Sequence, residues 1–304
     1  INFLKDLLNN SDNSDHRLRA LWSLHIISSY VDSDFEKLLN DKDEYIRGWS
    51  IKHIAEDKNI SDDILVQFKN LADLDNSPVV RLELASAIQR VRSEKRWDVI
   101  ESLVLKSEDI EDNNIPHMIW FALEPLVSLD PSRALKIANV SEIPMITEYV
   151  ARRLGDAELL FPLVETLKTS NKKDIFLEGM LASVEGNLEI KPPSNWDSVY
   201  DLLKNDNKSN EKALQISQLF GSNEATVEFI KILKDKSQPI DKRTNSLNLI
   251  LLKSPDELYS IIPSLIMEKE MRISAIRSIQ NIQEKGDFIY PLLYNYEEKG
   301  DIIP

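Results

Sequence analysis

The strongest constraint on the fold is a repeat in which an apolar helical segment carrying an arginine follows a polar, acidic turn. Five arginines occupy this position: Arg19, Arg47, Arg81, Arg243 and Arg272. The first three are separated by 28 and 34 residues and the last two by 29, and shorter amphipathic segments lie at 35–39 and 64–71. Self-similarity with a period of about 20 to 50 residues is typical of stacked repeats. The pattern therefore predicts an all-α solenoid of helix–turn–helix units.

The turns before Arg47 and Arg81 carry Asp43 and Asp75, and each arginine follows a branched apolar residue. This arrangement resembles the HEAT repeat, whose turn aspartate and helix arginine form a ladder between neighbouring repeats. The resemblance implies a right-handed superhelix in which the five arginines form a structural ladder with Asp43 and Asp75. A bidentate Arg–carboxylate pair suits this role because it satisfies polar groups of a turn that stacking buries.

Composition agrees with a helical fold and narrows the function. Only 7 glycines are present, whereas hairpin-rich β folds need glycine in their turns. The absence of cysteine excludes thiolate zinc sites, disulfides, thiol nucleophiles and a C-x-x-C-H haem attachment within this chain. A net charge of −14 disfavours nucleic acid and anionic lipid as partners. No apolar run reaches the roughly 18 residues that a membrane-spanning helix needs, so we predict no direct membrane insertion.

The least generic stretch is apolar at almost every position and predicts a central helix over 115–128. A helix that is hydrophobic all round is expected to be buried on all sides. Asn113 or Asn114 can cap it. Glu124 is the acid inside the helix, and Pro125 follows it at once, so we expect a kink at the proline.

The repeats divide the chain into two predicted parts. Residues 1–186 form HEAT-like repeats that include the central helix, although 108–155 depart from the arginine pattern. The proline-rich segment 187–196 marks a possible break, and 197–304 carry further helical repeats. Because 297–304 contain no closing element, we expect the chain to be a truncated piece of a longer protein.

Four segments, 19–22, 114–125, 143–144 and 151–154, together resemble the helical-repeat region of large bacterial membrane-bound dehydrogenase proteins. Those proteins resemble quinoprotein propellers in their front part and end in a c-type cytochrome. The resemblance implies a periplasmic or cell-envelope segment that lies between redox or sugar-binding modules. Haem c or a quinone cofactor would belong to other parts of such a parent, so we expect no cofactor in this chain.

Glu124 has two interpretations. Buried acids with shifted pKa values cluster at functional sites. A buried acid is also nearly always paired, and Arg81, Arg152 and Arg153 are candidate partners. We predict the structural ion pair. His117, in the first turn of the central helix, is the histidine that could act with Glu124, but a capping or packing role is predicted.

The histidines show no metal-binding spacing. There are four: His16, His25, His53 and His117. None is followed by Glu, so the His-Glu dyads of HEAT-like di-iron hydroxylases are absent. No glycine-rich phosphate loop or nucleophile elbow is present either. We therefore predict no catalytic, cofactor-binding or metal-binding residue.

Two further groups of side chains have both a functional and a packing interpretation. One is a basic cluster beside Trp97: Arg90, Arg92, Lys95 and Arg96. HEAT-like alkylpurine DNA glycosylases bind DNA with a basic surface, but in this acidic half of the chain we predict cations that complement a helix C-terminus. The other group is the tryptophans: Trp22, Trp49, Trp97, Trp120 and Trp196. They could stack on sugars, but the repeat positions of Trp22 and Trp49 favour packing.

These observations favour a non-catalytic scaffold that binds other proteins, either flanking domains or a separate partner. One alternative is part of a dehydrogenase active site, with Glu124 and His117, that a missing propeller completes. Another is a free-standing protein-binding repeat module. The sequence leaves the oligomeric state open.

Overall fold

The structure is a computed structural model that describes residues 1–57 and 60–279. Its regular elements in these ranges are eighteen α-helices and four short 3-10 helices, with no β-strand. The prediction of an all-α helical-repeat fold is confirmed, whereas the right-handed superhelix stays a prediction. Two compact units are present, residues 1–179 (unit 1) and 180–304 (unit 2). Of the described helices, none is long and apolar enough to cross a membrane.

Unit 1 holds the longer series of helices. They are α1 Asn2–Asn10, α2 Ser14–Ile26, α3 Asp32–Leu38, α4 Glu44–Ile54, α5 Asp62–Leu74, α6 Pro78–Ile88, α7 Trp97–Leu103, α8 Ile115–Val127, α9 Pro131–Val140, α10 Pro144–Asp156, α11 Leu160–Leu167 and the first half of α12 Lys173–Gly186. Three 3-10 helices lie between them: η1 Ala55–Asp57, η2 Ser93–Lys95 and η3 Ser107–Asp109.

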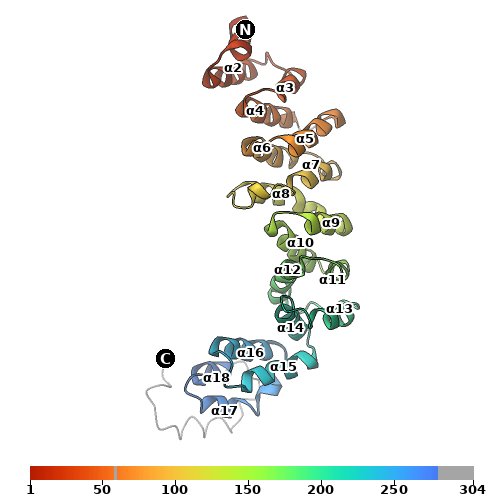
Figure 1. The fold of residues 1–304 in the computed structure, drawn as a ribbon, viewed down its shortest axis with the longest axis vertical. Coiled ribbons are helices and arrows are strands. Elements are labelled where there is room, and N and C mark those ends of the chain that lie inside the picture. The colour runs from red at the N-terminus through yellow and green to blue at the C-terminus, as the bar shows by residue number, and fades with distance from the viewer. Residues whose placement is uncertain (58–59, 280–304) are drawn as a thin grey trace. The chain divides into compact units, whose positions relative to one another are not determined.

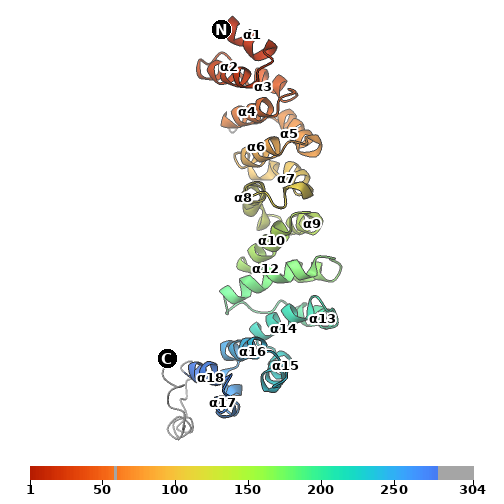
Figure 2. The ribbon, with the colours of Figure 1, turned by 60° about the vertical axis from the view of Figure 1, so that its left-hand side comes forward.

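The helices of unit 1 alternate between two layers (Figures 1 and 2). In the even layer, α2, α4, α6, α8 and α10 each pack against the next. In the odd layer, α5 packs against α7 and α9 against α11. The core lies between the layers, where residues such as Ile46, Leu84 and Ile119 have no exposed surface. The segment 108–155, which departs from the arginine pattern, keeps this same alternation.

Several helices of unit 1 begin at a residue whose side chain accepts a backbone hydrogen bond. These caps are Asn13, Asp43, Ser61, Ser77 and Asp130. Each satisfies an amide of the first turn that has no partner within the helix. The short polar turns predicted from the sequence are therefore also the signals that start the helices.

The central helix α8 is covered on one side only. Ile119 and Leu123 are fully buried, but Phe121 is 47% exposed, and Leu129 just beyond the helix is 70% exposed. The prediction that this helix is buried on all sides is therefore wrong. The reason is its place in the even layer: α6, α7, α9 and α10 contact it, and its remaining side faces solvent.

The start of α8 also differs from the prediction. Asp112, rather than Asn113 or Asn114, supplies the cap, because its Oδ1 accepts hydrogen bonds of 2.8 Å from the backbone N–H groups of Asn114 and Ile115. Pro125 lies inside α8, which continues to Val127. The kink at this proline stays a prediction.

Unit 2 continues the helical series. Its helices are α13 Trp196–Leu203, α14 Asn210–Leu219, α15 Asn223–Lys234, α16 Ile240–Lys253, α17 Ile262–Ile266 and α18 Arg272–Ser278, with the 3-10 helix η4 Pro255–Leu258. Helix α16 packs against α14, α15 and α18. The predicted break at 187–196 covers the connection between α12 and α13, whereas the division between the units lies earlier, inside α12. Residues 280–304, which include the predicted truncated end at 297–304, lie outside the described residues.

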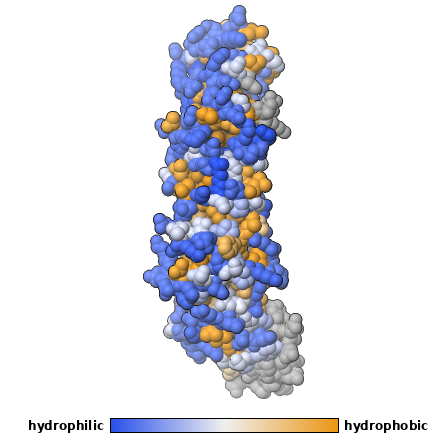
Figure 3. Space-filling view, turned by 90° about the vertical axis from the view of Figure 1, so that its right-hand side faces the viewer, coloured by the Kyte–Doolittle hydropathy of each residue, from blue (hydrophilic) through white to orange (hydrophobic). Residues whose placement is uncertain are grey.

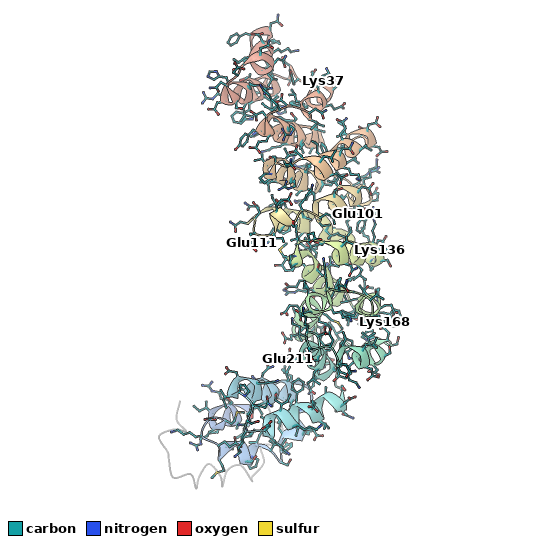
Figure 4. All side chains as sticks on the ribbon, viewed as in Figure 1. Lys37, Glu101, Glu111, Lys136, Lys168 and Glu211 are labelled. Atoms are coloured by element: carbon teal, nitrogen blue, oxygen red, sulfur yellow. The ribbon has the colours of Figure 1, made fainter. Side chains whose placement is uncertain are left out.

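The surface is mixed in character. Figure 3, from the right-hand side of Figure 1, shows apolar residues in small groups among hydrophilic ones. In unit 1, the labelled side chains of Lys37, Glu101, Lys136 and Lys168 lie on the side of the odd layer, whereas Glu111 lies on the opposite side (Figure 4). Charged side chains of both signs therefore occupy the outside of the odd layer.

Candidate functional site

The predicted Arg–Asp pairs connect successive turns of unit 1. Arg47 donates from Nε and Nη2 to the carboxylate of Asp75, at 2.6 and 2.8 Å, and from Nη1 to the carbonyl of Asp41 at 2.8 Å. Arg81 repeats this geometry with the carboxylate of Asp109, at 2.6 Å for both bonds, and with the carbonyl of Asp75 at 3.3 Å. Each arginine therefore binds its own turn and the next one.

Two residues of the predicted ladder are replaced by near neighbours. Arg17, not Arg19, binds the turn carboxylate: its Nη1 lies 2.9 Å from Asp41 Oδ1, while its Nε donates to the carbonyl of Leu8 at 2.7 Å. Arg19 is exposed. Asp43 instead caps α4 and accepts a hydrogen bond from the Ser14 hydroxyl. The ladder of unit 1 is therefore Arg17–Asp41, Arg47–Asp75 and Arg81–Asp109.

Position within the helix decides which arginine joins the ladder. Arg17, Arg47 and Arg81 are each the fourth residue of an even-layer helix, and Arg243 is the fourth residue of α16 in unit 2. In the helices between them, this position is held by uncharged residues: Met118, Thr147, Phe176 and Ala213. The fourth residue faces the turn before its own helix, where a guanidinium meets backbone carbonyls.

In unit 2 the arginines make related contacts. Arg243 donates to the carbonyl of Leu233 at 2.8 Å and to Glu268 Oε2 at 2.8 Å, so a glutamate replaces the turn aspartate. Arg272 donates from Nε to the carbonyl of Ile266 at 2.9 Å. Both arginines are buried.

The pairing perturbs the ionisation of the ladder residues. Burial acts to raise the pKa of Asp41, but hydrogen bonds from Arg17 and from the Asp43 amide outweigh it, and the pKa of this carboxyl lies below its ordinary value. The hydrogen bond to Asp109 raises the pKa of Arg81. Both shifts favour the charged form of the group, as expected for ion pairs that hold turns together.

Glu124 lies on the solvent side of α8, and two of its three predicted partners, Arg152 and Arg153, lie on the solvent side of α10. Glu124 Oε1 is 3.8 Å from Arg153 Nε, and the two side chains are 46% and 36% exposed. The predicted ion pair with Arg153 is present, but Glu124 is half-exposed rather than buried. Arg152 and His117 are exposed, and Arg81 is committed to Asp109. Glu124 and His117 therefore do not form an enclosed site in this chain.

Aromatic side chains lie on the same two helices as that ion pair. Trp120 of α8 and Tyr149 of α10 are half-buried, and their rings pack edge to face at 5.4 Å. Phe121 lies beside Trp120 with 47% of its surface exposed. We call Trp120, Phe121, Tyr149 and Arg152 the α8–α10 patch. Its residue types, Trp, Tyr and Arg, are those enriched at the energetic centres of protein interfaces.

The other candidate groups serve packing or local ion pairs. Trp22 and Trp49 pack edge to face at 5.0 Å between α2 and α4, and Trp196 is buried. In the basic cluster, Lys95 pairs with Asp62, Arg92 with Glu94, and Arg96 donates to the carbonyls of Val91 and Gln89. Three cations of the cluster thus have local partners.

A group that the sequence did not suggest lies between α2, α4 and η1. The imidazole rings of His25 and His53 stack at 3.7 Å, tilted by 28°. Glu56 faces both: its Oε2 is 3.2 Å from His25 Nε2, and its Oε1 is 3.3 Å from His53 Nδ1. Burial, followed by the neighbouring His25, lowers the pKa of His53. We call these three residues the His–His–Glu cluster.

Spacing rules miss this cluster because its members come from three elements. A signal was nevertheless present, since His25 and His53 are 28 residues apart, the same separation as Arg19 and Arg47. Residues separated by one repeat length occupy neighbouring helices of a solenoid. A search at the repeat period, rather than at helical spacing, brings the two histidines together.

Comparison with known proteins does not assign this chain to a family. No protein-family model matches the sequence, and neither does any curated protein. Among solved structures, the chain is similar to an engineered protein whose crystal structure comes from the Northeast Structural Genomics Consortium, at 13% identity and a TM-score of 0.36 over 99% of this chain and 93% of that one. The description of the fold therefore rests on this chain's own helices.

Proposed function

We propose that this chain is a non-catalytic helical-repeat scaffold that binds another protein through the α8–α10 patch. The observation that carries the proposal is Phe121, a large aromatic side chain that is 47% exposed on a helix whose opposite side is fully buried. Aromatic side chains that pack into a partner dominate the energetics of many interfaces. The predicted non-enzymatic role agrees with the half-exposed, ion-paired state of Glu124.

The chemistry of the patch defines the partner. Phe121 and Tyr149 offer apolar surface, and Arg152 is exposed and forms no ion pair with any residue that the structure describes. A partner segment with an apolar side chain and a nearby carboxylate would match both features. Either a flanking domain of a larger parent or a separate protein can supply such a segment.

The scaffold role also draws on the ladder. Buried pairs such as Arg81–Asp109 fix the register between successive turns. The solvent-facing sides of α4, α6 and α8 are therefore held in a fixed orientation relative to one another. A rigid surface loses little conformational entropy on binding. The ladder and the patch therefore suit a protein that positions a partner rather than one that transforms a substrate.

Site-specific photocrosslinking tests the proposal. A photoreactive residue at position 121, compared with one at the exposed aromatic position Phe3 on α1, should capture a specific protein in cells of the source organism. Binding of that purified protein should weaken at least about tenfold in Phe121→Ala and in Arg152→Glu, and stay unchanged in Phe3→Ala. A partner that binds Phe121→Ala as tightly as the unaltered chain would refute the patch. Redox or hydrolase turnover by the isolated chain would refute the non-catalytic role.

The link to dehydrogenase parents and to the periplasm rests on sequence resemblance alone, and the natural reading frame tests it. A propeller encoded upstream and a C-x-x-C-H cytochrome encoded downstream would make this chain their connecting scaffold. A reading frame with neither module would leave a free-standing protein-binding repeat module, and the α8–α10 patch would then serve a separate partner.

A further inference from the structure

The His–His–Glu cluster brings three potential metal ligands together on separate elements of the N-terminal repeats. Its donor atoms all lie within 4.8 Å of one another. Ligands that share a Zn²⁺ ion lie about 2.0 to 2.2 Å from it, and hence about 3 to 4 Å from each other. The two carboxylate–imidazole distances, 3.2 and 3.3 Å, already fall in that range.

The surroundings of the cluster are those of a built site. The side chain of His53 is 4% exposed, and the Phe35 and Trp49 rings lie 5.0 and 5.5 Å from its ring. His53 Nδ1 faces Glu56, and the other ring nitrogen, Nε2, is buried and has no hydrogen-bond partner in the described parts of the chain. His25 and Glu56 are 32% and 43% exposed, which leaves an entry path from solvent.

The donor set selects the kind of ion. Two imidazoles and one carboxylate suit borderline divalent transition metals, whereas Mg²⁺ and Ca²⁺ prefer all-oxygen sites. Three protein ligands complete only part of a tetrahedral shell, so at least one position stays open to water or to a group from a partner. The chain contains no cysteine that could compete for the ion.

We propose that His25, His53 and Glu56 bind a single divalent transition-metal ion of the Zn²⁺ type. The ion replaces the direct imidazole–carboxylate contacts, and the half-exposed His25 ring turns out of its stack on His53, because the lone pair of an imidazole nitrogen lies in the plane of its ring. It joins the end of α2 to the end of α4 and to η1, and so fastens the first two even-layer helices together. This function is separate from the α8–α10 patch.

Two measurements on the full chain test the site. Isothermal titration calorimetry measures Zn²⁺ binding, and thermal unfolding with and without Zn²⁺ measures the stabilisation. One ion should bind per chain and raise the unfolding temperature, because a ligand that binds only the folded state stabilises it. His25→Ala and Glu56→Gln, both at half-exposed positions, should weaken binding at least about tenfold and remove the thermal shift. The exposed histidines provide matched controls, and His16→Ala and His117→Ala should bind like the unaltered chain.

Co²⁺ supplies a second readout that does not depend on stability. Its visible absorption should appear on binding to the unaltered chain and to both controls, and be lost in His25→Ala. Absence of saturable binding of one ion would overturn the proposal. Zn²⁺ binding that His25→Ala and Glu56→Gln leave unchanged would show an adventitious ion only, and would overturn it as well.

Discussion

The two halves of unit 1 stack the same kind of helix in different ways. From α2 to α7, buried or half-buried arginines at the fourth helical position bind the carboxylates of neighbouring turns. From α8 to α12, the same position holds Met118, Thr147 and Phe176, and no ladder can form there. The comparison teaches that the layer arrangement does not need the ladder, because apolar packing maintains it as well.

In the second half, α12 approaches the backbone of α10 closely at one point. A Cβ atom on Gly179 of α12 would lie 2.0 Å from the carbonyl oxygen of Glu148 on α10 and 2.9 Å from the Ala151 Cβ. Such contact between backbones is possible only where a side chain is absent. Charged pairs therefore connect the turns of the first half, whereas at Gly179 in the second half the shape of the two helices sets their spacing.

Arg81→Met should have the largest effect on the first half. The variant leaves the carboxylate of Asp109, which is 2% exposed, without its two guanidinium hydrogen bonds. Removing one partner of a buried pair costs about 3 to 5 kcal/mol in the free energy of unfolding. Urea denaturation followed by circular dichroism measures this loss. The double variant Arg81→Met/Asp109→Leu should recover most of the lost free energy of unfolding. If it does not, the unpaired Asp109 carboxylate is not the main cause of the loss.

Gly179→Ala should have the next largest effect, in the second half. The added methyl group meets a backbone oxygen that cannot rotate away, so we expect a loss of about 1 to 3 kcal/mol. Gly186 lies at the end of the same helix, and a methyl group added there would meet no atom within 4 Å, so Gly186→Ala is the control. Equal denaturation midpoints for the two variants would contradict the close-approach interpretation.

Thr147→Val tests what replaces an arginine at the fourth position. The buried Thr147 hydroxyl donates to the carbonyl of Ala138 at 2.7 Å, as the Arg17 guanidinium does to that of Leu8. Loss of one such bond should lower the free energy of unfolding by about 1 kcal/mol. Thr166→Val on α11 is the control, because the Thr166 hydroxyl is only part-buried and bonds within its own helix. A Thr147→Val variant as stable as the unaltered chain would show that this carbonyl needs no side-chain donor.

Lowering the pH should destabilise the first half of unit 1 before the second half. We expect this change in stability to be the smallest of the four effects. The folded-state pKa of Asp41 lies below its ordinary value of 3.8, so the pair with Arg17 contributes stability above about pH 4, and this contribution is lost as the pH falls through the folded-state pKa. Hydrogen exchange between about pH 4 and pH 3 should show α2 and α4 losing protection faster than α10. Asp41→Asn should remove this difference in protection between the helices. If α2, α4 and α10 of the unaltered chain lose protection equally, the prediction is contradicted.

The sequence predicted the helices, and it named Arg47 and Asp75, which pair in the structure, among the ladder residues, because helical periodicity and turn residues are local signals. It assigned Arg19 in place of Arg17 because the choice depends on where α2 begins, and the Asn13 cap sets that start. It placed Glu124 in the core because an apolar segment does not reveal which of its sides neighbours cover. The His–His–Glu cluster was missed because its contacts arise only when neighbouring repeats stack.

The ladder also has a mechanical consequence. Arg17 binds the carboxylate of Asp41, the carbonyl of Asp41 binds Arg47, and Arg47 binds Asp75, whose carbonyl binds Arg81. These bonds form links in series along the first repeats, so a pulling force applied at the N-terminal end passes from one turn to the next. We expect extension there to proceed in discrete ruptures, one arginine at a time, whereas the repeats from α8 to α12, which have no arginine at the fourth helical position, should separate gradually.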